Sequence, residues 1–490
     1  MDIHLSAGGL LLHAGGAWHF VDSELIAAAA WPLESALPAE LEPLFQSAQD
    51  VWMRHIGLET LLSQLGQQCH RCNQQSTWES VSVPNSCQRL RVQDAGPARG
   101  RGLFTTESHA AGDLLLAESA HSAVLHRPAW RHYCHHCLVR ISGPTVRCAR
   151  SSCCPEIYCS EECVAQAWSR GHVAECGTLL HQIAPRQVLL CLRALVAGAG
   201  SRSLDELLAL HDHAPSMGPA RLSRLRFHAH LAFSVARPVL AARAHATGCP
   251  MATKEDLCLL LRLALTNSFL VSDERKGSFA SGEEDAATTQ EAFREGIGEA
   301  LFTSASRLNH SCAPNTGVRH VGRSLEVRAA LALPPGEEVV ICYGPQAGYT
   351  TLESRRGALQ RSHFFTCACS ACEREAAVHA TATGRGEDAS AMRLRAQRHD
   401  EMARELCEGG DFTGAAQATS RALELLRRVF APGSSQLAHE EAKLAELYFN
   451  IRPDARAAAA LRKAAAAMAA CYGEDHDEVR DLCRLSALCR

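Results

Sequence analysis

The segment LNHSCAPN, from Leu308 to Asn315, places an amide, an imidazole, a hydroxyl and a thiol within a few residues. Side chains of these types bind metals, hold ligands or take part in catalysis. They interrupt a sequence that is otherwise typical of buried, regular structure. This segment alone is compatible with either a metal site or a catalytic centre.

One segment further upstream holds eight candidate zinc ligands. Six of them have spacings that zinc sites use: two residues between the first two cysteines, and i, i+4 pairs on one helical face for Cys159 with Cys163 and for His172 with Cys176. The ligands are Cys134, Cys137, Cys148, one of Cys153 or Cys154, Cys159, Cys163, His172 and Cys176. Eight ligands suffice for two tetrahedral zinc ions. Unrelated buried thiols are the alternative, but so short a segment could hardly form a core without metal.

A second cysteine cluster, CACSAC, contains Cys367, Cys369 and Cys372. Three thiolates leave a tetrahedral zinc ion one ligand short. Cys312, about 55 residues earlier, is the candidate fourth ligand if the fold brings the two segments together. Zinc would then hold a later segment against the LNHSC loop.

Strand and turn patterns flank this loop. Apolar residues recur from Val318 to Val327 around a Gly322-Arg323 turn, which predicts a hairpin. The stretch LPPGEEVVICY predicts a Pro-Gly turn followed by a buried strand that ends at Tyr343. Upstream, the glycines of GRG at 100–102 allow a ligand to approach the backbone closely, although such a tripeptide alone can be a plain turn.

Helical patterns fill much of the rest. Apolar residues recur with helical spacing between Gly177 and Leu265, with polar Gly, Ser and Pro interruptions. After Glu375 the chain becomes alanine-rich, which indicates closely packed helices of a tetratricopeptide-like kind or a plain helical bundle. The N-terminal region mixes a helix-like stretch, Leu41 to Leu65, with polar segments.

Composition limits the class of protein. The 490 residues predict two to four modules, and a formal net charge of -4 with a pI near 6.7 argues against direct nucleic acid binding. No signal peptide is expected at Gly8 to Ala17, and no window has the roughly 20 apolar residues of a membrane helix. We expect a cytoplasmic and nuclear protein whose 23 cysteines include metal ligands.

The upstream cluster resembles the MYND zinc finger, in which two sites interleave. The resemblance implies one zinc on Cys134, Cys137, Cys159 and Cys163. It implies a second zinc on Cys148, Cys153, His172 and Cys176. Cys153 is preferred over Cys154 because its distance to Cys159 matches the family.

The whole arrangement resembles the SET and MYND domain-containing family of protein lysine methyltransferases. The matching segments, in the family's order, are GRGLF, the finger, TNSF, GIGEALFTSASRLNHSCAPN, EEVVICYG and CACSAC. They extend from about Ala95 to Glu375. The YGP after the strand and the helical C-terminal lobe look closest to the member that carries tetratricopeptide repeats.

The resemblance implies an α+β fold, a SET-type β fold split by a MYND finger and a helical insert. The expected parts are an N-terminal region (1–94), the first part of the SET domain (95–133), the finger (134–176), the insert (177–265), the catalytic SET core (266–345), a post-SET zinc segment (346–375) and an all-helical tetratricopeptide-like C-terminal domain (376–490).

The resemblance also assigns roles. Tyr343 would be the catalytic residue, with its hydroxyl directed at the transferring methyl group, and Asn309 and His310 would hold S-adenosylmethionine. Cys312, Cys367, Cys369 and Cys372 would bind a third zinc. Further cofactor-binding positions would be Gly100, Arg101, Gly102, Asn267, Phe269, Tyr343 and Phe365.

The implied function is S-adenosylmethionine-dependent N-methylation of lysine in histone or non-histone proteins. The alternative is an adaptor that uses its finger and helical repeats to recruit chromatin regulators as a transcriptional co-repressor, with weak or no methyl transfer. Implied partners are a protein substrate and proline-containing peptides bound by the finger, with no membrane. Asn309, His310 and Tyr343 together favour the enzyme.

Overall fold

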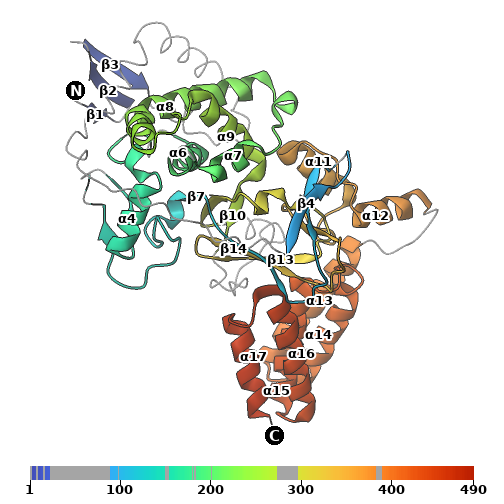
Figure 1. The fold of residues 1–490 in the computed structure, drawn as a ribbon. Coiled ribbons are helices and arrows are strands. Elements are labelled where there is room, and N and C mark those ends of the chain that lie inside the picture. The colour runs from blue at the N-terminus through green and yellow to red at the C-terminus, as the bar shows by residue number, and fades with distance from the viewer. Residues whose placement is uncertain are drawn as a thin grey trace. The chain divides into compact units, whose positions relative to one another are not determined.

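The computed structural model describes residues 3–6, 9–14, 17–22, 89–97, 99–148, 150, 154–178, 180, 184–199, 201–272, 296–381 and 389–489 (Figure 1). The chain divides into two compact units. The first comprises Met1–Ser82, Ser119–Ser306 and His320–Ser324, and the second comprises Val83–Glu118, Arg307–Arg319 and Leu325–Arg490. No helix among these described residues has the length and apolar character needed to cross a membrane.

The N-terminus begins with three strands that the sequence did not predict. Strands β1 (Ile3–Ser6), β2 (Gly9–Ala14) and β3 (Ala17–Asp22) pair in sequence order, each antiparallel to the next. Alanine and leucine in a short run do not distinguish strand from helix. The helix-like stretch from Leu41 to Leu65 lies outside the described residues.

The first unit contains a small three-stranded sheet. Its strand order is β10 (Phe269–Val271), β11 (Gly298–Leu301) and β7 (Ser122–Leu125), with antiparallel pairing throughout. A Cβ at Gly298 would lie 2.2 Å from the Val124 carbonyl oxygen, so glycine is what lets these strands pair. A short 3-10 helix, η2 (Arg127–Ala129), follows β7.

Four α-helices form the helical insert. Helix α6 (Arg186–Gly198) packs against β7 and β11 and is buried along almost its whole length. Around it lie α7 (Arg202–Leu208), α8 (Pro219–Thr247) and α9 (Lys254–Asn267), with η4 (Ala214–Ser216) between α7 and α8. The sequence predicted α6 and α9 from their apolar spacing. It did not mark α8, because His, Arg and Ala leave that helix with no strong apolar stripe.

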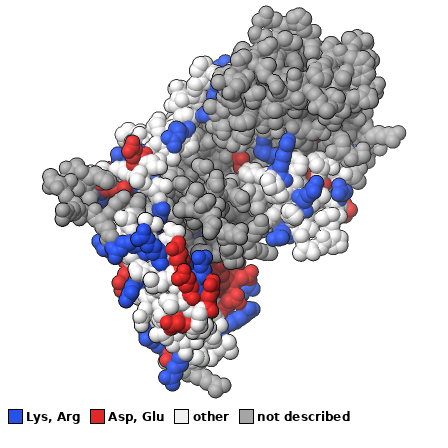
Figure 2. Space-filling model, turned by 180° about the vertical axis from the view of Figure 1, so that it is seen from behind, with Lys and Arg blue, Asp and Glu red and all other residues white. Residues whose placement is uncertain are grey.

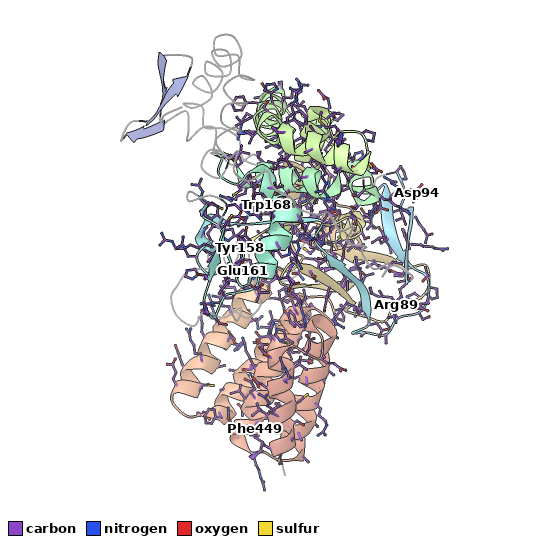
Figure 3. The ribbon with its side chains drawn as sticks, turned by 60° about the vertical axis from the view of Figure 1, so that its left-hand side comes forward. Arg89, Asp94, Tyr158, Glu161, Trp168 and Phe449 are labelled. Carbon is purple, nitrogen blue, oxygen red and sulfur yellow. The ribbon has the colours of Figure 1, made fainter. Side chains whose placement is uncertain are left out.

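The finger is a compact part of the first unit. It contains β8 (Val146–Arg147) paired with β9 (Ile157–Tyr158), helix α4 (Glu161–Ser169) and η3 (His172–Ala174). The Ser160 side chain caps α4 by accepting a hydrogen bond from the Cys163 amide. Tyr158 and Trp168 (Figure 3) are buried with the candidate ligand cysteines and form the finger's small core.

One sheet and most of another belong to the second unit, while the tip of the latter's hairpin, His320–Ser324, is grouped with the first unit. The first has the order β12 (Asn309–His310), β15 (Glu338–Ile341), β5 (Arg101–Thr105) and β4 (Leu90–Asp94), and only β12 and β15 are parallel. The second sheet has the order β13 (Thr316–Val321), β14 (Ser324–Ala329) and β6 (Leu114–Ser119). Its β13–β14 hairpin confirms the predicted turn at Gly322, whose φ is 57°. The predicted strand toward Tyr343 ends earlier than expected, at Ile341.

The rest of the second unit is helical. Helices α11 (Leu352–His363) and α12 (Ser370–Thr381) precede α13 (Ala389–Glu408), α14 (Phe412–Leu426), α15 (Ser435–Ile451), α16 (Ala455–Tyr472) and α17 (Asp477–Leu488). From α13 on, each helix packs against the next, with small buried residues such as Ala415 and Ala464 at the contacts. The starts of α13 and α15 lie further apart than the roughly 34 residues of a tetratricopeptide repeat, so that assignment stays a prediction.

Charges of both signs are interspersed on these C-terminal helices, in the lower part of Figure 2. Several form ion pairs, such as Lys443 with Asp400 at 3.0 Å and Arg427 with Glu441 at 2.8 Å. This face therefore carries no extended field of one sign.

Candidate active site and zinc sites

The LNHSC segment is held by the neighbouring strand β15. Asn309 and His310 pair in parallel with Val340 and Ile341, and the Ser311 amide donates to the Ile341 carbonyl at 2.8 Å. Further along, the Asn315 side chain donates to the Glu338 carbonyl at 2.8 Å and accepts from the Val340 amide at 3.0 Å. Where the segment no longer pairs with β15 as a strand, the Asn315 side chain supplies the hydrogen bonds instead.

Tyr343 lies beside this loop, two residues beyond β15. Its amide donates to Nδ1 of His310 at 3.0 Å, and its hydroxyl donates to the Leu308 carbonyl at 2.6 Å. The ring stacks on His363, with centroids 4.9 Å apart, and meets Phe365 edge-on. Burial raises the pKa of the Tyr343 hydroxyl above its usual range, so the phenol stays neutral.

His310 links Tyr343 to a cysteine. Burial lowers the pKa of His310 to about 4, so the imidazole is neutral near pH 7. Because Nδ1 accepts the Tyr343 amide proton, the ring proton must be on Nε2. That nitrogen lies 3.2 Å from Sγ of Cys312, to which it can donate.

Cys312 comes together with the CACSAC cluster. Its Sγ lies 3.8 Å from Sγ of Cys367 and 3.5 Å from Sγ of Cys372, and with Cys369 the four sulfur atoms lie within 4.8 Å of one another. These separations are too long for disulfides, but they match the edge of about 3.8 Å that a sulfur tetrahedron has around zinc at about 2.3 Å. The donor set fits a four-thiolate zinc site.

One buried arginine accompanies this group. Arg355, on α11, is fully buried and donates to Sγ of Cys372 at 3.7 Å and to Glu375 at 2.5 Å. A zinc ion with four thiolates carries a net charge of about -2, and a guanidinium offsets part of it. No pattern in the sequence indicates this role, because an arginine on a helix is usually exposed.

The GRG segment approaches Asn309. The Asn309 side-chain amide donates to the Glu338 carboxylate at 2.8 Å and to the Arg101 carbonyl at 3.3 Å. A Cβ at Gly102 would lie 2.7 Å from Glu338 Oε1 and 2.8 Å from Asn309 Nδ2, so a larger residue would displace one of these side chains. Arg99 pairs with Glu338 at 2.8 Å. Gly100 has a φ of 67°, a conformation that glycine adopts without strain.

Phe365 lies where helix α11 ends. The preceding residue, Phe364, adopts the left-handed region with a φ of 62°, which stops the helix and redirects the chain. The Phe365 ring lies 6.0 Å from that of His310 and 6.4 Å from that of Tyr343, measured between centroids. The second unit thus gathers most of the predicted cofactor-binding residues around one loop.

Two further predicted residues belong to the first unit. Asn267 ends α9, and its side chain donates to the Leu263 carbonyl at 2.9 Å. Phe269, in β10, packs edge-on against Phe302 at 5.3 Å between centroids. Their assignment to the cofactor site stays a prediction.

In the finger, the first group of thiols contains the four cysteines that the sequence predicted. The Sγ of Cys159 lies 3.7 Å from that of Cys137 and 3.5 Å from that of Cys163, and Cys134 completes the group. The set fits a second four-thiolate zinc site by the same tetrahedral criterion.

The other finger group, as far as its residues are described, includes Cys154. Cys148, His172 and Cys176 come together with Cys154, whose Sγ lies 3.4 Å from Nε2 of His172. Cys153, which family spacing preferred, lies outside the described residues. Because Cys154 already completes four buried donors, the structure favours this alternative, which the residue spacing had left open.

Zinc content distinguishes the two cysteines. Cys154→Ser is expected to lower the zinc bound per chain from about three to about two, because a tetrahedral site loses one of its four donors. Cys153→Ser should retain about three. Native mass spectrometry of the purified variants measures the stoichiometry directly, and the opposite pattern would return the ligand role to Cys153.

Several residues of the site were not predicted from the sequence. No pattern in the sequence singled out Glu338, yet its carboxylate holds both Asn309 and Arg99. His363 stacks on Tyr343 from a helix whose partner the sequence could not show. The position of Glu338 in EEVV, just before three buried strand residues, is the one signal that pointed toward the sheet edge.

The comparisons agree with this geometry. Residues 100–344 match the family model described as SET domain, which is half of the chain. The chain therefore belongs to the SET domain family, as its motifs predicted.

Curated relatives indicate which kind of SET domain protein this chain is. The chain is 25% identical to human N-lysine methyltransferase SMYD2 over 79% of this chain and 95% of that protein. It is 27% identical to chicken SMYD2, over 60% of this chain and 61% of the relative, and 26% identical to mouse protein-lysine N-methyltransferase SMYD4, over 57% and 45%. It is thus a SET and MYND domain-containing protein. A particular kinship to the member with tetratricopeptide repeats stays a prediction.

Among solved structures, the SET domain of LSMT bound to lysine and AdoHcy aligns over 82% of this chain and 84% of that chain. The TM-score is 0.26 at 11% identity, a likeness that supports no argument by itself.

Proposed function

We propose that this protein transfers a methyl group from S-adenosylmethionine to a lysine amine of a protein substrate. The observation that carries the proposal is the loop in which Asn309, His310 and Tyr343 are held together, next to a four-cysteine group that includes Cys312. The relatives, named as lysine methyltransferases, support the same reaction.

The residues around the loop suit a charged, adenine-containing ligand. Gly100 leaves the backbone open to close approach, because nothing lies within 4 Å of the place its Cβ would take. Asn309 and His310 would hold the ligand from β12. Phe365 offers an aromatic face for adenine. Zinc would hold Cys312 and the CACSAC segment together, so that Phe365 stays near His310.

Bound S-adenosylmethionine supplies an electrophilic methyl group on a sulfonium centre. The protein's part is to align a lysine nitrogen with that methyl and to favour the uncharged amine, because a lysine with a pKa of about 10.4 is almost wholly protonated near pH 7. A buried, water-poor approach lowers that pKa.

Tyr343 would face the methyl group while it passes from the sulfonium sulfur to the lysine nitrogen. Its hydroxyl proton is used in the bond to the Leu308 carbonyl, so the oxygen presents lone pairs rather than a hydrogen. Such an oxygen can accept weak hydrogen bonds from a polarised methyl group or a bond from the incoming amine. The bond also fixes the ring against rotation.

Gly102→Ala is expected to weaken S-adenosylmethionine binding at least about tenfold, or about 1.4 kcal/mol. The added methyl group would displace the Glu338 carboxylate or the Asn309 amide, each less than 3 Å away. Calorimetric titration measures the effect. Gly143→Ala serves as the matched control, because a Cβ there meets nothing within 4 Å. Equal affinities for both variants would exclude this packing as a determinant of the cofactor site.

Methyl transfer itself can be followed with S-adenosylmethionine labelled in the methyl group. The zinc-loaded protein is incubated with a cell extract, and the protein hydrolysate is analysed for labelled methyl-lysine. We expect label in methyl-lysine with the wild type and none above background with Tyr343→Phe. Label that is equal for both proteins would come from another enzyme in the extract and would count against the proposal.

We also propose that the finger binds proline-containing peptides of chromatin regulators and that the protein works in the cytoplasm and nucleus. Support comes from the resemblance of the finger to its family and from cysteine-rich groups that suit a reducing compartment. Titration of the zinc-loaded protein with proline-rich peptides tests the first point, with a Cys137→Ser variant as the control for finger folding.

A further inference from the structure

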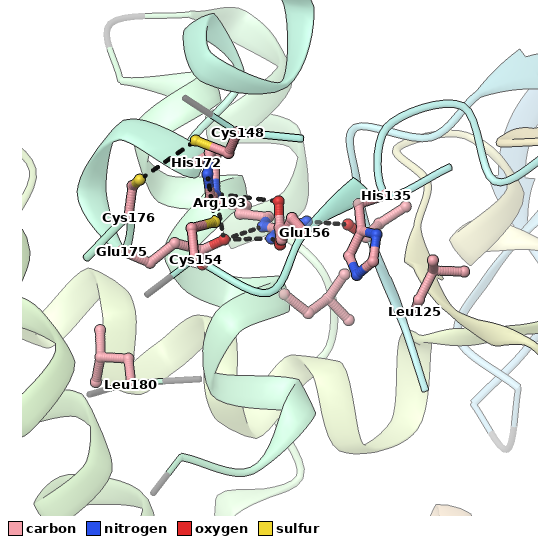
Figure 4. Close-up of polar contacts among 12 residues, drawn as sticks. Leu125, His135, Cys148, Cys154, Glu156, His172, Glu175, Cys176, Leu180 and Arg193 are labelled. Atoms are coloured by element: carbon pink, nitrogen blue, oxygen red, sulfur yellow. Dashed lines mark hydrogen bonds and ion pairs between the residues drawn. The ribbon is translucent and has the colours of Figure 1, made fainter. Parts of the chain in front are cut away.

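Four charged or titratable side chains are buried together between the finger and helix α6 (Figure 4). Glu156, His172 and Glu175 come from the finger, and Arg193 comes from the middle of α6. Their exposed fractions are 2%, 1%, 0% and 7%, respectively. Burying a charged group without a partner costs free energy. The arrangement of these four side chains must therefore provide each of them with partners.

His172 connects this cluster to the second finger site. Its Nε2 lies 3.4 Å from Sγ of Cys154, on the side of the candidate zinc ligands. Its Nδ1 lies 3.1 Å from the Glu156 carboxylate and 3.3 Å from the Glu175 carboxylate. A zinc-binding imidazole keeps its proton on the other nitrogen, and a carboxylate that accepts this proton fixes the ring orientation.

Arg193 holds the two carboxylates in place. Its Nε donates to Glu175 at 2.8 Å, and its Nη2 donates to both Glu156 and Glu175. Tyr158 supplies a further hydrogen bond to Glu156, at 2.5 Å. The planar guanidinium suits such a forked contact, which a lysine could not reproduce.

The same arginine is anchored to the sheet. Its Nη1 donates to the Ala123 carbonyl of β7 at 3.3 Å. Next to His172, Gly171 has a φ of 130°, and a Cβ there would lie 2.7 Å from Cα of Arg193. The finger backbone and α6 are therefore in direct contact at this point, and no side chain separates them.

A third metal ion in the finger does not explain the cluster. Glu156, His172 and Glu175 have donor atoms close enough to bind one. However, Arg193 already supplies the positive charge between the carboxylates, and His172 faces the cysteine ligands with its other nitrogen. The cluster is thus an extension of the second finger site.

We propose that Arg193 is a positioning residue that couples zinc binding at the second finger site to the docking of helix α6. Zinc fixes His172, His172 fixes the two carboxylates, and the carboxylates hold Arg193 and with it α6 against β7. Coupling between two equilibria is reciprocal, so loosening α6 also weakens the zinc site. The inference rests on zinc in the finger and is independent of methyl transfer.

The first test is the release of zinc to a chelator from the full-length protein. In Arg193→Met, one of about three zinc ions should leave at least about tenfold faster than in the wild type, with the other two unchanged. A general loss of stability would instead accelerate all three. Arg243→Met is the matched control, because Arg243 also joins the finger to α6 but donates to the backbone carbonyls of Ser169 and Ala197.

The second test is hydrogen exchange in α6. Cys176→Ser, which removes a ligand of the second site, should reduce the exchange protection of residues 188–196. Cys137→Ser, which removes a ligand of the first site, should leave that protection as it is. If Arg193→Met fails to fold, Glu175→Gln tests the same link with smaller loss of packing. Unchanged zinc release in a folded Arg193 or Glu175 variant, or equal α6 protection in the two cysteine variants, would overturn the proposal.

Discussion

Replacing Tyr343 with phenylalanine is expected to reduce methyl transfer by about 100-fold or more while the protein still binds S-adenosylmethionine. The substitution removes one hydroxyl oxygen and keeps the ring that stacks on His363 and contacts Phe365. Loss of the bond to the Leu308 carbonyl should cost about 1 kcal/mol of stability. Single-turnover transfer measures the rate, and calorimetry measures binding.

Comparing the change in transfer rate with the change in cofactor affinity distinguishes a role in catalysis from a role in binding. If the rate falls but the affinity stays within about threefold, the hydroxyl acts on the reaction itself. Turnover equal to that of the wild type would remove Tyr343 from the mechanism. Tyr349→Phe is a suitable control, because the Tyr349 ring packs on Phe430 and its hydroxyl contacts Gln436, neither of which belongs to the LNHSC loop.

Replacing Cys312 with serine is expected to release about one zinc ion per chain and to weaken S-adenosylmethionine binding at least about tenfold. Serine leaves three cysteine ligands and removes the sulfur that lies 3.2 Å from Nε2 of His310. His310 also accepts the Tyr343 amide proton on Nδ1. Losing the Cys312 sulfur should therefore loosen His310 and, through it, Tyr343. Native mass spectrometry gives the zinc count, and calorimetry gives the affinity.

Cys342→Ser is the matched control for that experiment. Cys342 directly precedes Tyr343 in the chain and is not one of the four cysteines in the group. It should keep about three zinc ions and bind the cofactor as the wild type does. A Cys312→Ser protein that kept all its zinc, or one that lost a zinc ion with no change in affinity, would show that metal and cofactor sites are independent.

Much of this site could be predicted from the sequence, because it depends on local motifs and on the number of ligands that zinc requires. The three thiolates of CACSAC needed a fourth ligand, and Cys312 was the unused candidate beside a polar loop. The Pro-Gly turn and the apolar run after it defined β15, and the Gly322 turn defined the β13–β14 hairpin. Family spacing, in contrast, pointed to Cys153, whereas the described group contains Cys154.

The residues that sequence reasoning missed act through long-range packing. Arg193 lies in a helix rich in leucine, and nothing local shows that its guanidinium meets two carboxylates from the finger. Arg355 likewise meets Cys372 only because α11 and α12 pack together. Helix α8 was missed for a different reason, because its alanines, histidines and arginines form no apolar stripe. Burial of a charge is decided by tertiary structure, which spacing alone does not encode.

The most direct test of the central claim is calorimetric titration of the zinc-loaded wild-type protein with S-adenosylmethionine and with S-adenosylhomocysteine, alongside Asn309→Ala. The Asn309 amide links the GRG segment to Glu338, so its removal should disrupt the site while leaving the zinc groups intact. We predict micromolar binding of both ligands by the wild type and loss of binding in Asn309→Ala. A folded, fully zinc-loaded wild-type protein that binds neither ligand would contradict the methyltransferase assignment and favour an adaptor function.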